Sequence, residues 1–142
     1  MKLQYARKLT VMAVSFWLLP SFALYADESE QQMGVAREMV QVLEAYAVYK
    51  MGQYDLAFER YQTLAESGSH QGIYNLANMY ANGLGVEQSD AKAFEWYLKG
   101  AKAGDRLCMH AVAQAYAQGI GTEADPILAD FWRAKAALES DE

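Results

Sequence analysis

Apolar residues recur at steps of three and four along most of the chain, which is the spacing of amphipathic helices. The first run comprises Val35, Met39, Val42, Leu43, Tyr46 and Tyr49, and Gly52 follows it. No segment shows the strict apolar–polar alternation of a half-buried strand. The pattern therefore predicts an all-α chain, with helices over about 35–51, 54–66, 70–82, 90–103, 107–118 and 126–137.

Glycines and short polar residues mark the helix ends. Gly68 and Gly104 break consecutive helices, as expected of residues that terminate helices. Ser89 or Asp90 is the expected N-cap of the 90–103 helix, because a short oxygen-bearing side chain can accept a free amide hydrogen there. Asp125 followed by Pro126 is a strong start signal, since proline lacks only an amide that has no partner at the first helical position.

The chain repeats itself with a period of 36 residues. Five residues of Asn78–Tyr97 return 36 residues later, as Tyr80/Tyr116, Gly83/Gly119, Gly85/Gly121, Ala93/Ala129 and Trp96/Trp132. A fixed period in this range is typical of stacked-repeat proteins, in which each helical pair buries its apolar face against the next pair. The repeated glycines of Gly83-Leu84-Gly85 therefore predict a turn between helices and not a phosphate-binding loop.

The middle copy, YNLANMYANGLGVEQSDAKAFEWYLKGAKAGD, resembles the Sel-one-like (SLR) repeat, a relative of the tetratricopeptide (TPR) repeat. Residues 105–139 resemble a second copy, and residues 35–68, which lack the Gly-x-Gly turn, resemble a TPR unit; 69–104 is the full copy. The resemblance implies an α/α solenoid of about three helix-turn-helix repeats, followed by a short acidic tail at 140–142. It also implies protein–protein interaction, with exported members acting in envelope assembly, signalling or host contact.

The N-terminus has the order of regions found in a secretory signal peptide. Basic residues precede the uncharged run Leu9–Leu19, and small residues follow before the acidic Asp27. An uncleaved anchor is the alternative, but eleven apolar residues fall short of the ~20 that a spanning helix needs. We expect residues 1–26 to be the signal, with cleavage after Ala23 or Ala26, and 27–34 to be a flexible leader. The expected location is the periplasm or the exterior.

The charge balance argues against several partner classes. The chain has 12 basic and 18 acidic residues, for a net charge of −6. Removal of Lys2, Arg7 and Lys8 with the signal would leave nine basic residues and a net charge of −9. Such a protein is repelled by phosphate backbones and anionic lipids, so neither nucleic acid nor a membrane surface is an expected partner.

The first helix of each pair is expected to line a concave groove. Its outward positions lie two before, one after and four after a small alanine, which makes them neighbours on one helix face. Asparagine and glutamine amides there can hold a peptide backbone, and tyrosines can hold side chains. An alternative for the tyrosines is packing against neighbouring segments. The candidate groove residues are Leu43, Tyr46, Tyr49, Asn75, Asn78 and Gln114, with Tyr74 and His110 on the flanks.

The C-terminal end offers a second candidate surface. Leu128, Phe131 and Leu138 would have no following layer of helices to cover them. Repeat arrays need a polar terminal face, and about three repeats is the lower limit for a stable array. We therefore expect the last helix to curl these residues inward, or to be covered by a partner or by a second copy in a homodimer.

No residue set suggests catalysis, a metal site or a cofactor. His70 and His110 lie in different repeats, and Cys108 and His110 are two apart on different helix faces, so they would not share one zinc ion. Cys108 is expected to be a buried small residue, with a free or intermolecularly paired thiol as alternatives. The sequence favours a non-enzymatic envelope adaptor; a secreted factor engaging a host protein and, third, a hydrolase-like activity on a cell-wall or β-lactam substrate are the alternatives.

Overall fold

A computed structural model describes residues 27–138. The expected signal peptide and the acidic tail lie outside the described residues. The chain divides into two compact units, residues 1–39 and 40–142, and each is considered by itself.

Residues 27–50 are helical, so the expectation of a flexible leader at 27–34 was wrong. This stretch has no glycine or proline before Gly34, so it contains no residue that breaks a helix until that point. Gln31 also donates a hydrogen bond from Nε2 to Asp27 Oδ2 at 3.3 Å, across one helical turn. A helix can extend without apolar periodicity, and the pattern of apolar residues therefore missed it.

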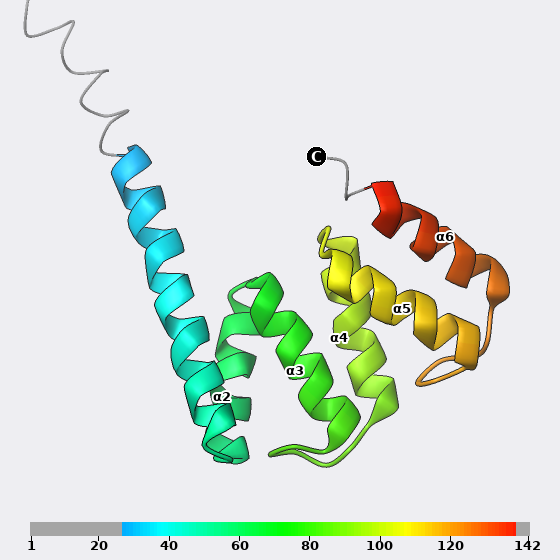
Figure 1. The fold of residues 1–142 in the computed structure, drawn as a ribbon, viewed down its shortest axis with the longest axis horizontal. Coiled ribbons are helices and arrows are strands. Elements are labelled where there is room, and N and C mark those ends of the chain that lie inside the picture. The colour runs from blue at the N-terminus through cyan, green and yellow to red at the C-terminus, as the bar shows by residue number, and fades with distance from the viewer. Residues whose placement is uncertain (1–26, 139–142) are drawn as a thin grey trace, which may run out of the picture. The chain divides into compact units, whose positions relative to one another are not determined.

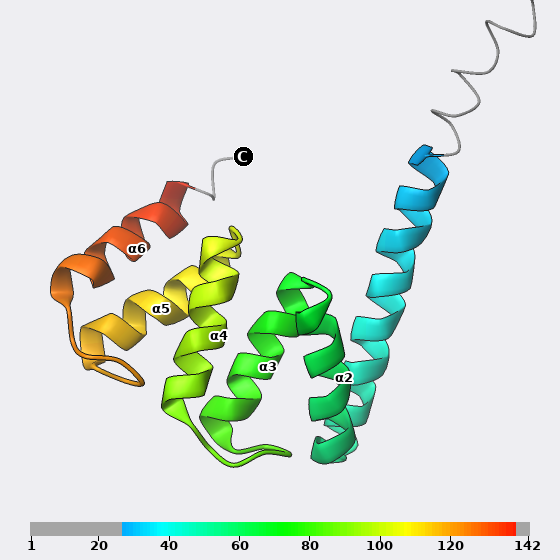
Figure 2. The same ribbon diagram turned by 180° about the vertical axis from the view of Figure 1, so that it is seen from behind.

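The second unit is a stack of helices in chain order, with no strand among its described residues. After the helix that ends at residue 50, each helix packs against the one before it, as the two ribbon views show (Figures 1 and 2). Their bounds match the expected ranges to within about a residue: α2 Tyr54–Glu66, α3 His70–Asn82, α4 Asp90–Lys102, α5 Arg106–Gln118 and α6 Pro126–Leu138. The predicted all-α solenoid is confirmed.

Side-chain caps set where these helices start. Ser89, not Asp90, caps α4, because its hydroxyl accepts from the Lys92 amide at 3.3 Å. Asp125 Oδ1 accepts from the amides of Ile127 and Leu128 at 2.9 and 3.0 Å, which confirms the Asp-Pro start of α6. Each cap satisfies amides that have no partner within the helix.

The Gly-x-Gly turns join the two helices of a repeat and hold them close to the preceding pair. Gly85 and Gly121 have φ of 68° and 69°, which only glycine adopts without strain. A Cβ at Gly85 would overlap the carbonyl oxygen of Tyr54, and one at Gly121 would overlap that of Asp90. The glycines therefore allow each turn to rest on the start of an earlier helix, which confirms their structural role.

Candidate binding groove

A small hollow brings together four of the predicted groove residues. Tyr46 and Tyr49 from the first helix meet Asn75 and Asn78 from α3 around a space of about 170 Å³. Tyr61 from α2 lies against the same space. This hollow one, lined by Tyr46, Tyr49, Tyr61, Asn75, Asn78, Met79, Asn82 and Leu84, has no charged side chain in its lining.

Tyr61 is one of the residues of hollow one that the sequence did not single out as a groove residue. Only 1% of the residue is exposed, yet its hydroxyl makes no hydrogen bond to any residue that the structure describes. Burial raises its pKa to about 12, and the nearby phenols of Tyr49 and Tyr46 raise it further. The hydroxyl is therefore neutral and protonated at physiological pH. Its recurrence 36 residues later as Tyr97 was the available signal.

A second hollow repeats the first, one repeat further along. It also has a volume of about 170 Å³, and Tyr97, Ala111, Gln114, Ala115 and Ile120 occupy the places of Tyr61, Asn75, Asn78, Met79 and Leu84. In this hollow two, Ala81 takes the place that Tyr49 has in hollow one. The two residues are equivalent because Ala81 lies four residues after Ala77, as Tyr49 lies four residues after Ala45. The groove thus consists of two equivalent hollows with different linings, the first richer in tyrosine.

Asn78 connects the two hollows. The Tyr97 hydroxyl donates to Asn78 Oδ1 at 2.6 Å, which takes one of the two acceptor sites of this oxygen and leaves the Nδ2 group as the main group for a partner. Asn75 is in the opposite state, because its Nδ2 donates to the Gln71 carbonyl at 2.8 Å and its Oδ1 is left as an acceptor. Together α3 therefore presents one donor and one acceptor to hollow one.

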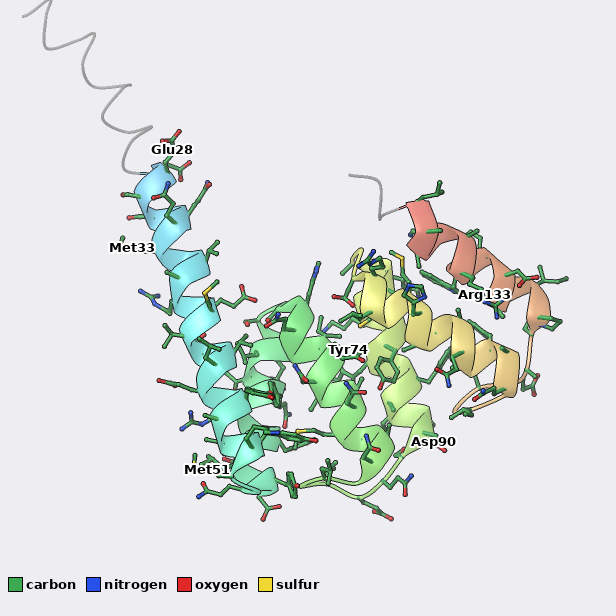
Figure 3. The ribbon with its side chains drawn as sticks, in the orientation of Figure 1. Glu28, Met33, Met51, Tyr74, Asp90 and Arg133 are labelled. Atoms are coloured by element: carbon green, nitrogen blue, oxygen red, sulfur yellow. The ribbon has the colours of Figure 1, made fainter. Side chains whose placement is uncertain are left out.

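The two flanking residues lie outside the hollows. Tyr74, labelled in Figure 3, packs its ring against that of Tyr97, with the centroids 6.0 Å apart. It therefore supports the floor of hollow two from the side. His110 is exposed on α5 and lines neither hollow. A further hollow of about 290 Å³ lies between residues 41–44 and α2, where Arg60 Nη1 and Glu44 Oε2 lie 3.4 Å apart.

The predicted apolar residues of α6 are exposed. The exposed fractions are 37% for Leu128, 56% for Phe131 and 73% for Leu138, and Ile127 reaches 80%. In α4, which is covered by α5, the equivalent positions are also exposed but are occupied by Ala91, Lys92, Glu95 and Lys102. The absence of a further helix in the described residues is therefore not what exposes them, and of the two alternatives for this end the inward curl was wrong.

Residues that would have faced a following layer are instead small or polar. Tyr97 and Leu98 of α4 correspond to Arg133 and Ala134 of α6. Arg133, labelled in Figure 3, forms an ion pair with Asp130 on the helix surface. At the two positions where α4 carries Tyr97 and Leu98, α6 is thus polar or small, and the apolar patch formed by Ile127, Leu128, Phe131 and Leu138 is a separate feature of α6.

Cys108 is buried and free in the structure. Burial raises the pKa of its thiol above the ordinary value, and the adjacent Asp105, which also caps α5, acts in the same direction. A protonated, buried thiol is a poor nucleophile. No group of residues that could hold a metal ion occurs within residues 27–138, and no helix in that range is long and apolar enough to cross a membrane.

Known proteins share this architecture. The Sel1 repeat profile matches residues 70–105 and 106–141. A Sel1 repeat protein from Oxalobacter formigenes is 33% identical with a TM-score of 0.58; the match covers 60% of this chain and 65% of that one. A protective antigen of uropathogenic Escherichia coli strains, which displays an SLR fold, is 36% identical with a TM-score of 0.59, over 61% of this chain and 18% of that one.

The chain spans less than two thirds of the length of either of these structures. No curated protein matches it. The two matched repeats nevertheless make up half of the chain, and they coincide with the helical pairs α3–α4 and α5–α6. The chain belongs to the Sel1 repeat family.

Proposed function

We propose that this protein is an exported, non-enzymatic adaptor of the bacterial cell envelope that binds an extended peptide or a helix of a partner along hollows one and two. Sel1 repeats generally mediate protein–protein interaction and typically form non-catalytic scaffolds. The observation that carries the proposal is that the first hollow recurs as hollow two, at a distance of one repeat along the chain. A regular ligand could place successive side chains in such equivalent sites.

The chemistry of the lining suits a peptide. Asn75 Oδ1 and Asn78 Nδ2 leave an acceptor and a donor on one helix face, which can pair with the amide and carbonyl groups of an extended backbone. Tyr46 and Tyr49 supply large, amphipathic surfaces that lose little entropy on binding. The order of basic residues, the uncharged run 9–19 and small residues supports export, since it is the arrangement of a signal peptide.

The proposal is tested by affinity capture from envelope extracts with wild type and with Tyr46→Ala/Asn75→Ala/Gln114→Ala. Asn78 is left intact because it supports Tyr97. The control is Glu59→Ala/Glu95→Ala, which changes exposed residues of α2 and α4. Helicity by circular dichroism should be the same for all three proteins.

A partner held by wild type and the control but lost by the triple variant is the expected result. Its direct affinity, measured with the purified partner, should fall at least about tenfold, since each buried polar contact contributes on the order of 1 kcal/mol. A partner retained by all three proteins would move the contact away from the groove. Turnover of an envelope substrate by the purified protein would overturn the non-enzymatic assignment.

A second candidate is a secreted factor that engages a host protein. The similarity to a protective antigen of uropathogenic Escherichia coli strains supports this alternative. The same three proteins would distinguish it, because the groove-dependent partner would then come from host extracts and not from envelope extracts.

The proposal includes a second contact, in which the apolar patch of α6 packs against a second copy of the chain. Its support is that the interior helix α4 carries charged or small residues at the same positions. About three repeats is also the lower limit for an array that is stable by itself, so association would add buried apolar surface where it is most needed.

A further inference from the structure

The two hollows differ in one hydroxyl: the tyrosine of hollow two has a hydrogen-bond partner in the described chain, and the equivalent tyrosine of hollow one has none. In hollow two the Tyr97 hydroxyl has a partner, Asn78 Oδ1 at 2.6 Å. In hollow one the Tyr61 hydroxyl has none among the described residues, although only 1% of Tyr61 is exposed. A ligand that fills hollow one would shield this hydroxyl from solvent, and it must therefore supply a hydrogen-bond partner to avoid the cost of leaving it unpaired.

The Tyr61 hydroxyl opens onto the hollow. No fully buried polar side-chain atom within residues 27–138 lacks a hydrogen-bond partner. Because the Tyr61 hydroxyl has no partner there, its oxygen must reach the surface of the space that it lines. In the first helix the residue equivalent to Asn78 is Tyr46, because each directly follows a small alanine, Ala77 or Ala45. Tyr46 is 51% exposed. The first repeat thus has a tyrosine where the second has the amide that satisfies Tyr97.

The size of hollow one restricts what can enter. Its volume of about 170 Å³ is below the roughly 300–1,000 Å³ of pockets that enclose a whole small molecule. A single side chain of a partner is the scale of group that it fits. This matches a groove in which each hollow takes one residue of a bound peptide.

The lining of hollow one favours positive charge. Three phenol rings line it, and the face of an aromatic ring attracts cations. Asn75 Oδ1 and the Tyr61 oxygen are acceptors, and no basic side chain lies in the lining to repel a cation. The chain as a whole carries a net charge of −6, which also favours a cation over an anion.

A lysine of the chain lies at the edge of the hollow. Lys50 Nζ lies 5.9 Å from the centroid of the Tyr46 ring. Lys50 itself is exposed and is not among the residues that line the hollow, so the space beside Tyr61 stays open.

We propose that hollow one is the specificity pocket of the groove and takes a cationic side chain, arginine or lysine, of the bound partner, with Tyr61 and Asn75 accepting its hydrogen bonds. This inference rests on the proposed adaptor function. Beyond that function, the inference specifies the charge of the partner residue that is recognised and the repeat of this chain that recognises it. Hollow two differs, because its tyrosine is already bonded, alanines replace Tyr49 and Asn75, and Asp90 lies in its lining. Any attraction of a cation to hollow two would therefore come from that carboxylate and not from the tyrosine hydroxyl.

The test starts from a positional-scanning library of extended nonapeptides bound to the purified protein. Arginine or lysine should be enriched at one position. The best peptide is then compared with its citrulline analogue, or with its norleucine analogue if lysine is selected, by isothermal titration calorimetry. Removal of the charge should weaken binding to wild type about tenfold, because hydrogen bonds to charged groups are the stronger ones.

Tyr61→Phe isolates the role of the hydroxyl, since it keeps the ring and removes a group with no partner in the described chain. Tyr116→Phe is the matched control, because Tyr116 lines neither hollow. The charge preference should shrink by at least about threefold in Tyr61→Phe and stay unchanged in Tyr116→Phe.

Peptides that bind without enrichment of a basic residue would overturn the pocket assignment and leave the adaptor function standing. The same conclusion would follow if the charge preference were equal in wild type and Tyr61→Phe. A library from which no peptide binds would overturn the adaptor function itself, and with it the pocket.

Discussion

The two junctions between consecutive repeats solve one packing problem in opposite ways. At the first, α2 presents Leu64 and α3 presents Gly72; at the second, the equivalent residues are Gly100 of α4 and Cys108 of α5. A Cβ at Gly72 would overlap Leu64, and a Cβ at Gly100 would overlap the Cys108 sulfur. Each crossing therefore pairs one larger residue with one glycine, and the helix that holds the glycine alternates.

The comparison shows that each crossing needs a glycine on one of its two helices and not a particular residue at each position. It also separates packing from binding. The buried crossings are compensated at both junctions, whereas the hollows above them differ, with the Tyr97 hydroxyl bonded and the Tyr61 hydroxyl open. Variation in the hollows can therefore serve recognition without a change in the stack.

The largest expected effect comes from breaking the second crossing. Gly100→Leu would force a large side chain against Cys108 and Ile73, and we expect a loss of about 3 kcal/mol or more in the free energy of unfolding. Adding Cys108→Gly recreates the arrangement of Leu64 and Gly72, and it should recover more than half of that loss. Urea unfolding followed by circular dichroism measures both.

A matched control is Cys108→Gly alone, which should cost about 1 kcal/mol for glycine in a helix interior, plus the loss of the packed thiol. If the effects of the two single substitutions simply add in the double variant, the two residues of this crossing do not compensate for each other's size.

The next effect compares the two tyrosine hydroxyls. Tyr97→Phe removes the hydrogen bond to Asn78 and should lower the free energy of unfolding by about 1 kcal/mol. Tyr61→Phe removes a hydroxyl without a partner in the described chain, so the change should stay below about 0.5 kcal/mol. The midpoints of urea unfolding give both values, and an equal loss at the two positions would contradict the difference between the hollows.

The helices could be predicted from the sequence because their ends are marked locally. Asp125-Pro126 and the glycines at 83 and 119 act through their own backbone neighbours, so no distant contact is needed to read them. Residues 27–34 were missed because helix extension there depends on helix-compatible residues and not on an apolar face. That Asn75 and Asn78 share one face of α3 followed from helical spacing alone.

The chemistry of the hollows could not be predicted in the same way. Whether Tyr61 or Tyr97 has a bonded hydroxyl depends on which side chain of another helix reaches it, and Asn78 lies 19 residues from Tyr97 in sequence. The exchange of sizes between Gly100 and Cys108 is likewise visible only when the two helices are seen in contact. The repeat period could be read from the sequence, but the pairs of side chains that come into contact in the fold could not.

A smaller effect should appear in alkali. Burial raises the pKa of Tyr61 from 10.0 to about 12, so between these pH values the unfolded chain loses a proton that the folded chain keeps. The folded state then binds more protons, and its stability falls as the pH rises through this range. Burial raises the pKa values of Tyr97 and Cys108 as well, which adds to the same trend.

Tyr61→Phe removes one of these three contributions. Its unfolding free energy should therefore fall less steeply than that of wild type between pH 10 and 12, as measured by urea unfolding at a series of pH values. Parallel curves for the two proteins would show that Tyr61 ionises as readily in the folded chain as in the unfolded chain.

The smallest effect on stability, with the clearest effect on association, should come from giving α6 the outer surface of α4. Ile127→Ala/Leu128→Lys/Phe131→Glu/Leu138→Lys replaces the apolar patch with the residues that α4 carries at these positions. All four side chains are exposed, so the free energy of unfolding at low protein concentration should change by only about 0.5 kcal/mol. Two lysines and one glutamate alter the net charge by one unit, so general repulsion would not explain a loss of association. In sedimentation velocity over a range of concentrations, wild type should associate and the variant should remain monomeric, whereas a wild type that is monomeric throughout would rule out the second copy as the partner of α6.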